Sequence, residues 1–231
     1  MFVGHYGPAL ATRAMRRPPS LAAAFVAVQW MDFVWAALIL AGVEHGRVVP
    51  HVMAMSNLVL YDMPYDHSLP GALVLSAIGA LIYRTLDRRS GWASAIAIAA
   101  LVFSHWVLDY LVHAPDLLLY PAGIKVGLGW WDSPALAIGS ELGVLVVGFA
   151  IYVWRTVPRN QAGRIAPWVT AAVMLGALAF DKLGPPPPDI KSEAAMALIS
   201  YVAFAALGHW LDTVREKVPP SAAVSVSAQG L

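Results

Sequence analysis

The sequence predicts an all-α membrane protein, a polytopic bundle of six transmembrane helices. Of its 231 residues, 59% are hydrophobic and only 13% are charged, whereas charged residues make up roughly one-quarter of soluble domains. Several uncharged stretches reach the ~20 residues needed to cross the ~30 Å hydrocarbon core of a bilayer. The few ionisable residues inside these stretches are the first candidates for a functional site, because charged groups within a membrane are costly and usually functional.

The predicted spans follow one another through short connections. The second span opens with a serine cap, Ser68, and a proline in the first turn, Pro70, which favour a helix start. Residues 185–188 are four prolines in a row, which cannot form a helix. The six spans cover about residues 20–42, 68–86, 91–113, 133–154, 165–181 and 193–212.

The chain is expected to form one transmembrane helical domain over residues 1–217. The small and polar tail, residues 218–231, is expected to be disordered and cytoplasmic. The N-terminal segment leaves two alternatives open. A half-helix over residues 2–15 either re-enters the membrane from the inner side, which would carry His5 about 15 Å deep, or lies on the inner surface as an interfacial helix.

The distribution of lysine and arginine predicts the orientation. The N-terminal segment carries three of them, the five connections carry one, three, one, three and two in turn, and the tail carries two. Because positive residues concentrate on the cytoplasmic side, both termini are predicted to be cytoplasmic. The net charge of +1 gives no reason to propose nucleic acid as a partner.

Three ionisable residues share one face of the third span. His105, Asp109 and His113 are spaced at i, i+4 and i+8, and each step of four residues advances only ~40° around a helix. Two imidazoles that flank a carboxylate are ligands accepted by zinc and other divalent ions. The chain has no cysteine, so any metal must be held by nitrogen or oxygen ligands. The alternative is structural, with a histidine bonded to a backbone carbonyl and an aspartate paired with it.

Ionisable residues of other spans are predicted to converge on the same, outer half of the membrane. Asp32 lies about 18 Å from the inner end of the first span. His67 stands at the outer mouth of the second span, and Glu141 falls in the outer half of the fourth.

The order of these motifs resembles a known family. The motifs GHY, QWMDFVW, PYDHSLPG and SHWVLD, over about residues 1–115, resemble the bacterial membrane-bound metal-dependent hydrolases, the YdjM-like inner-membrane proteins. The resemblance implies a bacterial inner membrane and a divalent metal. The chain departs from the family pattern at Asp62, where the family's histidine element begins with histidine. The metal ligands implied by the resemblance are His5, Asp32, His67, His105 and Asp109.

Two functions fit these residues. The first is a metal-dependent hydrolase that uses zinc or manganese at the outer face of the inner membrane, where a lipid or lipid-linked ester or phosphoester is the expected substrate. Glu141 or Asp62 would then serve as general base, while His113 and Ser68 would support the ligands or contact the substrate. The second is a proton- or cation-coupled transporter that uses the same histidines and aspartates. No internal repeat of the kind found in many transporters is evident.

Overall fold

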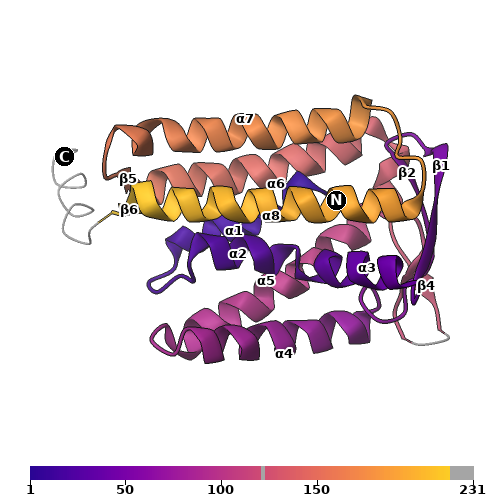
Figure 1. Cartoon of the computed structure of the whole chain (residues 1–231), viewed down its shortest axis with the longest axis horizontal. Coiled ribbons are helices and arrows are strands. Elements are labelled where there is room, and N and C mark those ends of the chain that lie inside the picture. The colour runs from indigo at the N-terminus through magenta and orange to yellow at the C-terminus, as the bar shows by residue number, and fades with distance from the viewer. Residues whose placement is uncertain (121–122, 219–231) are drawn as a thin grey trace, which may run out of the picture.

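Within residues 1–120 and 123–218, which the computed structural model describes, five helices are long and apolar enough to cross a membrane (Figure 1). Four of them agree closely with predicted spans, whereas α7 begins ahead of the predicted start at residue 165. The Ser68 hydroxyl accepts a hydrogen bond from the Gly71 N–H at 3.1 Å, which confirms the predicted cap. The five helices are α4 (Leu69–Leu86), α5 (Gly91–Val112), α6 (Pro134–Arg155), α7 (Gln161–Leu183) and α8 (Ile190–Val214).

The first predicted span is broken. Helices α2 (Leu21–Val28) and α3 (Trp30–Ala41) meet at the buried Gln29 with a bend of 52°. Counted as one broken span, the pair brings the number to six. The break contains neither proline nor glycine, so the local sequence does not predict it. It leaves the Val28 carbonyl at the C-terminal end of α2 and places Asp32 in the first turn of α3.

The N-terminal segment packs inside the bundle, which agrees with the re-entrant alternative. It consists of η1 (Val3–His5), α1 (Tyr6–Ala11) and η2 (Thr12–Ala14), and Figure 1 shows the N-terminus in the middle of the bundle. Glycines allow this packing, because a Cβ on Gly7 would collide with the backbone of Val144, and one on Gly148 with the Gly7 carbonyl. The segment therefore lies directly on the backbone of α6.

The connection over residues 43–67 contains a β-hairpin that the sequence analysis missed. Strands β1 (His45–Met53) and β2 (Ser56–Asp62) pair antiparallel across one end of the bundle. The minor pair β3 (Leu117–Leu118) and β4 (Lys125–Val126) lies at the same end as this hairpin, close to η3 (Trp130–Asp132) in the chain. Strands β5 (Thr156–Pro158) and β6 (Arg215–Lys217) pair at the opposite end.

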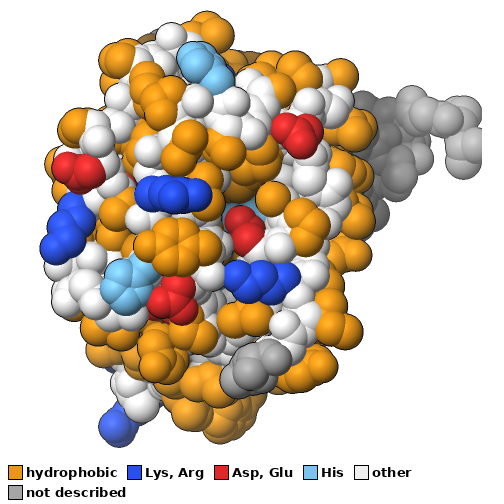
Figure 2. Space-filling model, turned by 90° about the vertical axis from the view of Figure 1, so that its right-hand side faces the viewer, with side chains coloured by type: hydrophobic (Ala, Val, Ile, Leu, Met, Phe, Trp, Pro, Cys, Tyr) orange, Lys and Arg blue, Asp and Glu red, His pale blue; other side chains and the backbone are white. Residues whose placement is uncertain are grey.

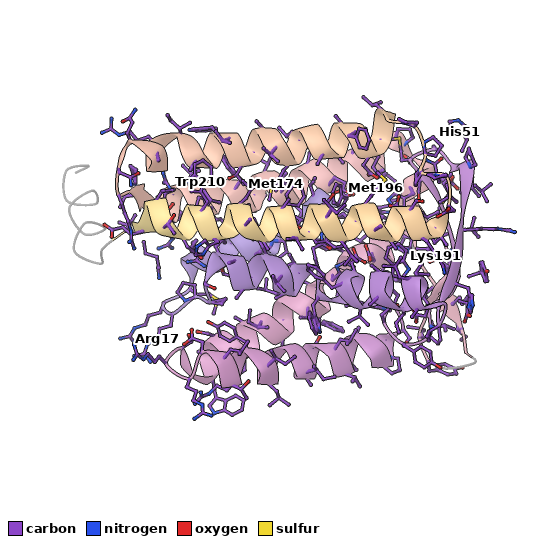
Figure 3. All side chains as sticks on the ribbon, in the orientation of Figure 1. Arg17, His51, Met174, Lys191, Met196 and Trp210 are labelled. Atoms are coloured by element: carbon purple, nitrogen blue, oxygen red, sulfur yellow. The ribbon has the colours of Figure 1, made fainter. Side chains whose placement is uncertain are left out.

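The two ends of the bundle differ in charge. Figure 3 shows His51 and Lys191 at the hairpin end and Arg17 at the opposite end. Of the 15 lysines and arginines, only Arg47, Lys125, Lys182 and Lys191 belong to segments at the hairpin end. This asymmetry agrees with the sequence argument for a cytoplasmic opposite end, and the orientation stays a prediction. The single domain over residues 1–217 also stays a prediction, and the predicted disordered tail lies, apart from Val218, outside the described residues.

Candidate metal centre

The structure brings the five ligands implied by the resemblance into one buried cluster. They come from η1, α3, the connection just before α4, and α5, and they form two groups that share His105. Within each group the candidate ligand atoms lie within 4.8 Å of one another. The first group is His5, His105 and Asp109, and the second is Asp32, His67 and His105. These five residues, together with His113, are called the His–Asp cluster below.

His105 is fixed by the break between α2 and α3. Its Nδ1 lies 2.7 Å from the carbonyl oxygen of Val28. A carbonyl only accepts, so Nδ1 carries the proton, and Nε2 of the neutral ring has a lone pair. That Nε2 is buried with no hydrogen-bond donor or acceptor assigned to it in the described part of the chain, and it faces the carboxylates of Asp32 and Asp109. A lone pair facing two carboxylates needs a cation between them, either a proton or a metal ion.

His67 repeats this arrangement. Its Nδ1 lies 2.7 Å from Asp66 Oδ1, so the carboxylate accepts the Nδ1 proton and Nε2 is left to face the cluster. The indole of Trp106 donates to the His67 carbonyl at 3.1 Å and fixes the backbone. A carboxylate behind a histidine is the usual support of a metal-ligating imidazole.

The spacing of the ligand atoms suits a shared ion. Asp32 Oδ1 lies 3.3 Å from Nε2 of both His67 and His105. Asp109 Oδ2 lies 2.9 Å from Nε2 of His105 and 3.6 Å from Nε2 of His67. Ligand atoms that surround a tetrahedral ion at ~2.0–2.1 Å are about 3.3 Å apart. Nitrogen and carboxylate oxygen ligands suit zinc and manganese, so the residues present fit a divalent ion.

His5 reaches the cluster from the N-terminal segment. Its Nε2 lies 3.1 Å from Asp109 Oδ1, which also lies 2.6 Å from the main-chain nitrogen of Met1. The His5 ring stacks on His105 with centroids 3.8 Å apart and planes at 5°. His5 is therefore held in the cluster by contacts with both Asp109 and His105.

His113 and Ser68 differ in their relation to the cluster. His113 Nδ1 lies 3.0 Å from Asp116 Oδ1, and its Nε2 lies 3.7 Å from Asp109 Oδ2, so it resembles His67 in its support. The Ser68 hydroxyl donates to the Pro64 carbonyl at 2.7 Å while it caps α4. Both bonds of Ser68 therefore serve the start of the helix.

The two predicted general bases have other partners. Glu141 accepts the N–H groups of Phe2 and Gly4 at 2.6 and 2.7 Å, so it anchors the N-terminal segment. Asp62 lies 2.8 Å from His45 Nδ1 at the end of the hairpin, and both side chains are about half exposed. Neither carboxylate belongs to the groups that could hold an ion. The role of either as general base stays a prediction.

A cavity of about 260 Å³ leads to the cluster from the hairpin end. Asp32, His67, Asp109 and His113 line it, and the hairpin, Trp131, the α7–α8 connection and α8 supply its other walls. Glu141 is not among the lining residues. Figure 2, which looks onto this end, shows an acidic side chain and a histidine together in a hollow near the middle of the face.

Several supporting residues escaped the sequence analysis. Asp66 could have been found, because it directly precedes His67. Tyr201 of α8 donates its hydroxyl to Asp32 Oδ2 at 2.7 Å, and the Val28 carbonyl supports His105. These two contacts join segments far apart in the chain, and no local pattern signals them.

Comparison with known proteins gives one family match. Residues 65–185 match the family described as YdjM inner membrane protein. This is just over half of the chain, and it confirms the family that the motifs resemble. The matched segment includes His67, His105 and Asp109, whereas His5 and Asp32 precede it. No curated protein and no solved structure gives a significant match.

Proposed function

The chain belongs to the YdjM inner membrane protein family, and from its buried His–Asp cluster we propose that it is a membrane-embedded, metal-dependent hydrolase. The observation that carries this proposal is the orientation of His67 and His105. Each ring donates through Nδ1 to an acceptor behind it and turns Nε2 toward two carboxylates at the floor of a cavity.

Some residues of the chain would bind the metal ion, and others line the cavity that leads to it. Asp32, His67, His105 and Asp109 would hold the ion. His5, whose Nε2 lies against Asp109, would be the fifth residue of the site. When bound, zinc or manganese supplies a Lewis acid that activates water and polarises a carbonyl or phosphoryl oxygen. Because most of these side chains are buried, their charges act on a substrate more strongly than they would in water.

The cavity sets the route of the substrate. Asp109, which lines the cavity, lies three residues before the end of α5, and His105 lies seven residues before it, so the two lie about 5 and 10 Å below that end of the helix. Both polar and apolar residues line the cavity, among them His113, Lys182, Met53 and Trp35. With the hairpin end outside, such a cavity suits a lipid or lipid-linked ester or phosphoester whose polar group enters from the outer face. In this proposal His113 contacts that polar group.

A transporter is the second candidate, and the break at Gln29 is the observation that favours it. Broken helices with ionisable residues beside the break are common where transporters bind ions near the middle of the membrane. Asp32 stands in that position, in the first turn of α3. Proteoliposomes that show proton or cation flux dependent on Asp32 and Asp109, with no released product, would establish transport instead.

The hydrolase is tested with Asp109→Asn, which removes a charge and keeps the volume. We expect the affinity of the purified variant for zinc or manganese to fall about ten-fold or more, while the protein stays folded. Release of phosphate or acid from a panel of lipid phosphoesters and esters should fall with metal content, and chelator should abolish it in the wild type. The matched control is Asp87→Asn at the opposite end of the bundle, which should change neither. A wild-type protein without bound metal or product release would contradict the proposal.

A further inference from the structure

Tyr201 of helix α8 contacts the cluster through Asp32. We propose that Tyr201 is a positioning residue that holds Asp32 in the orientation required to bind the metal ion, an inference that rests on the metal site of the proposed function. The hydroxyl of Tyr201 donates to Asp32 Oδ2 at 2.7 Å. In the described part of the chain it is the one side-chain hydroxyl that donates to a carboxylate of the cluster.

The place of Asp32 in the fold explains why it needs such a partner. Asp32 lies in the first turn of α3, just after the break, and its side chain is partly exposed to the cavity. A carboxylate can turn about its terminal bond and exchange its two oxygens. The bond from Tyr201 engages Oδ2 and leaves Oδ1 facing Nε2 of His67 and His105, at 3.3 Å from each.

Tyr201 is itself held firmly. Only 6% of its surface is exposed, and its ring packs edge-on against Phe33, one residue beyond Asp32, with centroids 5.4 Å apart. The same contact therefore fixes the first turn of α3 and the phenol. A fixed donor loses little further freedom when it orients the carboxylate.

The arrangement resembles the support of two other ligands, His67 and His105. His67 is held from behind by Asp66, and His105 by the Val28 carbonyl. Tyr201 gives Asp32 the same kind of support, from a helix that lies outside the segment matched by the family. Such supporting partners typically contribute 10- to 100-fold to metal affinity.

The test compares the zinc affinity of the full-length wild type with that of Tyr201→Phe, which keeps the ring and removes the hydroxyl. Affinity is measured in detergent by competition with a chromophoric zinc chelator. We expect the dissociation constant to rise about ten-fold or more. The melting temperature of the metal-free protein should change little, because the ring packing remains. The matched control is Tyr83→Phe, which also removes a tyrosine–aspartate hydrogen bond, to Asp87 at 3.1 Å, but outside the cluster.

A double-mutant cycle separates positioning from general packing. If Tyr201 acts through Asp32, its substitution should have no further effect on zinc affinity in an Asp32→Asn background. Full additivity of the two substitutions would overturn the inference, as would equal zinc affinity in wild type and Tyr201→Phe. A wild-type protein that binds neither zinc nor manganese would instead overturn the metal site of the proposed function.

Discussion

In three histidines of the cluster, a single hydrogen bond at Nδ1 orients the ring for the proposed metal binding. Nδ1 of His67 lies next to the carboxylate of the preceding residue, Asp66, and Nδ1 of His113 lies next to that of Asp116, three residues further on. Nδ1 of His105 instead lies next to the Val28 carbonyl of another helix. In these three rings the proton is placed on the nitrogen remote from the cluster. The nitrogen that remains is the one suited to bind a cation.

Glu44 is a buried carboxyl group that lies close to Asp66, the residue before His67. Glu44 follows α3, outside the spans, is 2% exposed, and accepts the N–H of Tyr65 at 2.8 Å. Its burial, together with the neighbouring Asp66, raises the pKa of the Glu44 carboxyl from about 4.5 to about 8. The folded protein therefore keeps a proton on Glu44 that the unfolded chain releases.

This pKa shift predicts a pH dependence of stability. Between pH 4.5 and about 8 the folded state binds more protons than the unfolded state, so stability falls as the pH rises through this window and levels off above it. The melting temperature of the metal-free protein, measured in detergent with chelator, should follow this course. Glu44→Gln should flatten the slope, and Glu216→Gln, whose side chain is about half exposed, should not. A rising slope in the wild type would contradict the prediction.

At the scale of elements, the contact of α1 with α6 decides whether His5 reaches the cluster. Gly7 and Gly148 bring the two backbones together, and Glu141 of α6 accepts the N–H groups of Phe2 and Gly4 just before α1. A side chain at either glycine would push the N-terminal segment away from α6.

Gly148→Ala tests this contact. The added methyl group would meet the Gly7 carbonyl, and overpacking of this kind typically costs about 1–3 kcal/mol of stability. We expect a lower melting temperature and weaker metal binding, because His5 moves with α1. Gly139→Ala in the same helix has no neighbouring atom within 4 Å and should be neutral or slightly stabilising. Equal stability of the two variants would show that the close approach is not required.

At the scale of the whole molecule, the two ends of the bundle differ in their number of lysines and arginines. Eleven of the 15 lysines and arginines belong to segments at the end opposite the hairpin. They are Arg13, Arg16, Arg17, Arg84, Arg88, Arg89, Arg155, Arg159, Arg164, Arg215 and Lys217. The positive-inside rule then predicts that the hairpin and the mouth of the cavity lie outside the cytoplasm.

Single cysteines test this orientation, since the natural chain contains none. Val52→Cys lies in the hairpin, and Gln161→Cys begins α7 at the opposite end; both positions are exposed. A membrane-impermeant thiol reagent added to whole cells should label position 52 alone. Labelling at position 161 without label at 52 would reverse the orientation and place the cavity on the cytoplasmic side.

The sequence by itself determined the number and approximate limits of the spans. Hydrocarbon requires long apolar segments whose backbone groups bond within the helix, so composition and length are enough to locate them. Helical periodicity likewise placed His105, Asp109 and His113 on one face of α5. These features depend on residues that are neighbours in the chain.

The tertiary structure alone decided how the site is assembled. The break at Gln29, the burial of His5 against α6, the hairpin over the cavity and the bond from Tyr201 to Asp32 all depend on contacts between distant segments. Their energies come from packing and from hydrogen bonds of buried polar groups with partners elsewhere in the chain. Neither composition nor local pattern contains those partners, and for that reason Tyr201 and Val28 became visible only when the helices were placed beside one another.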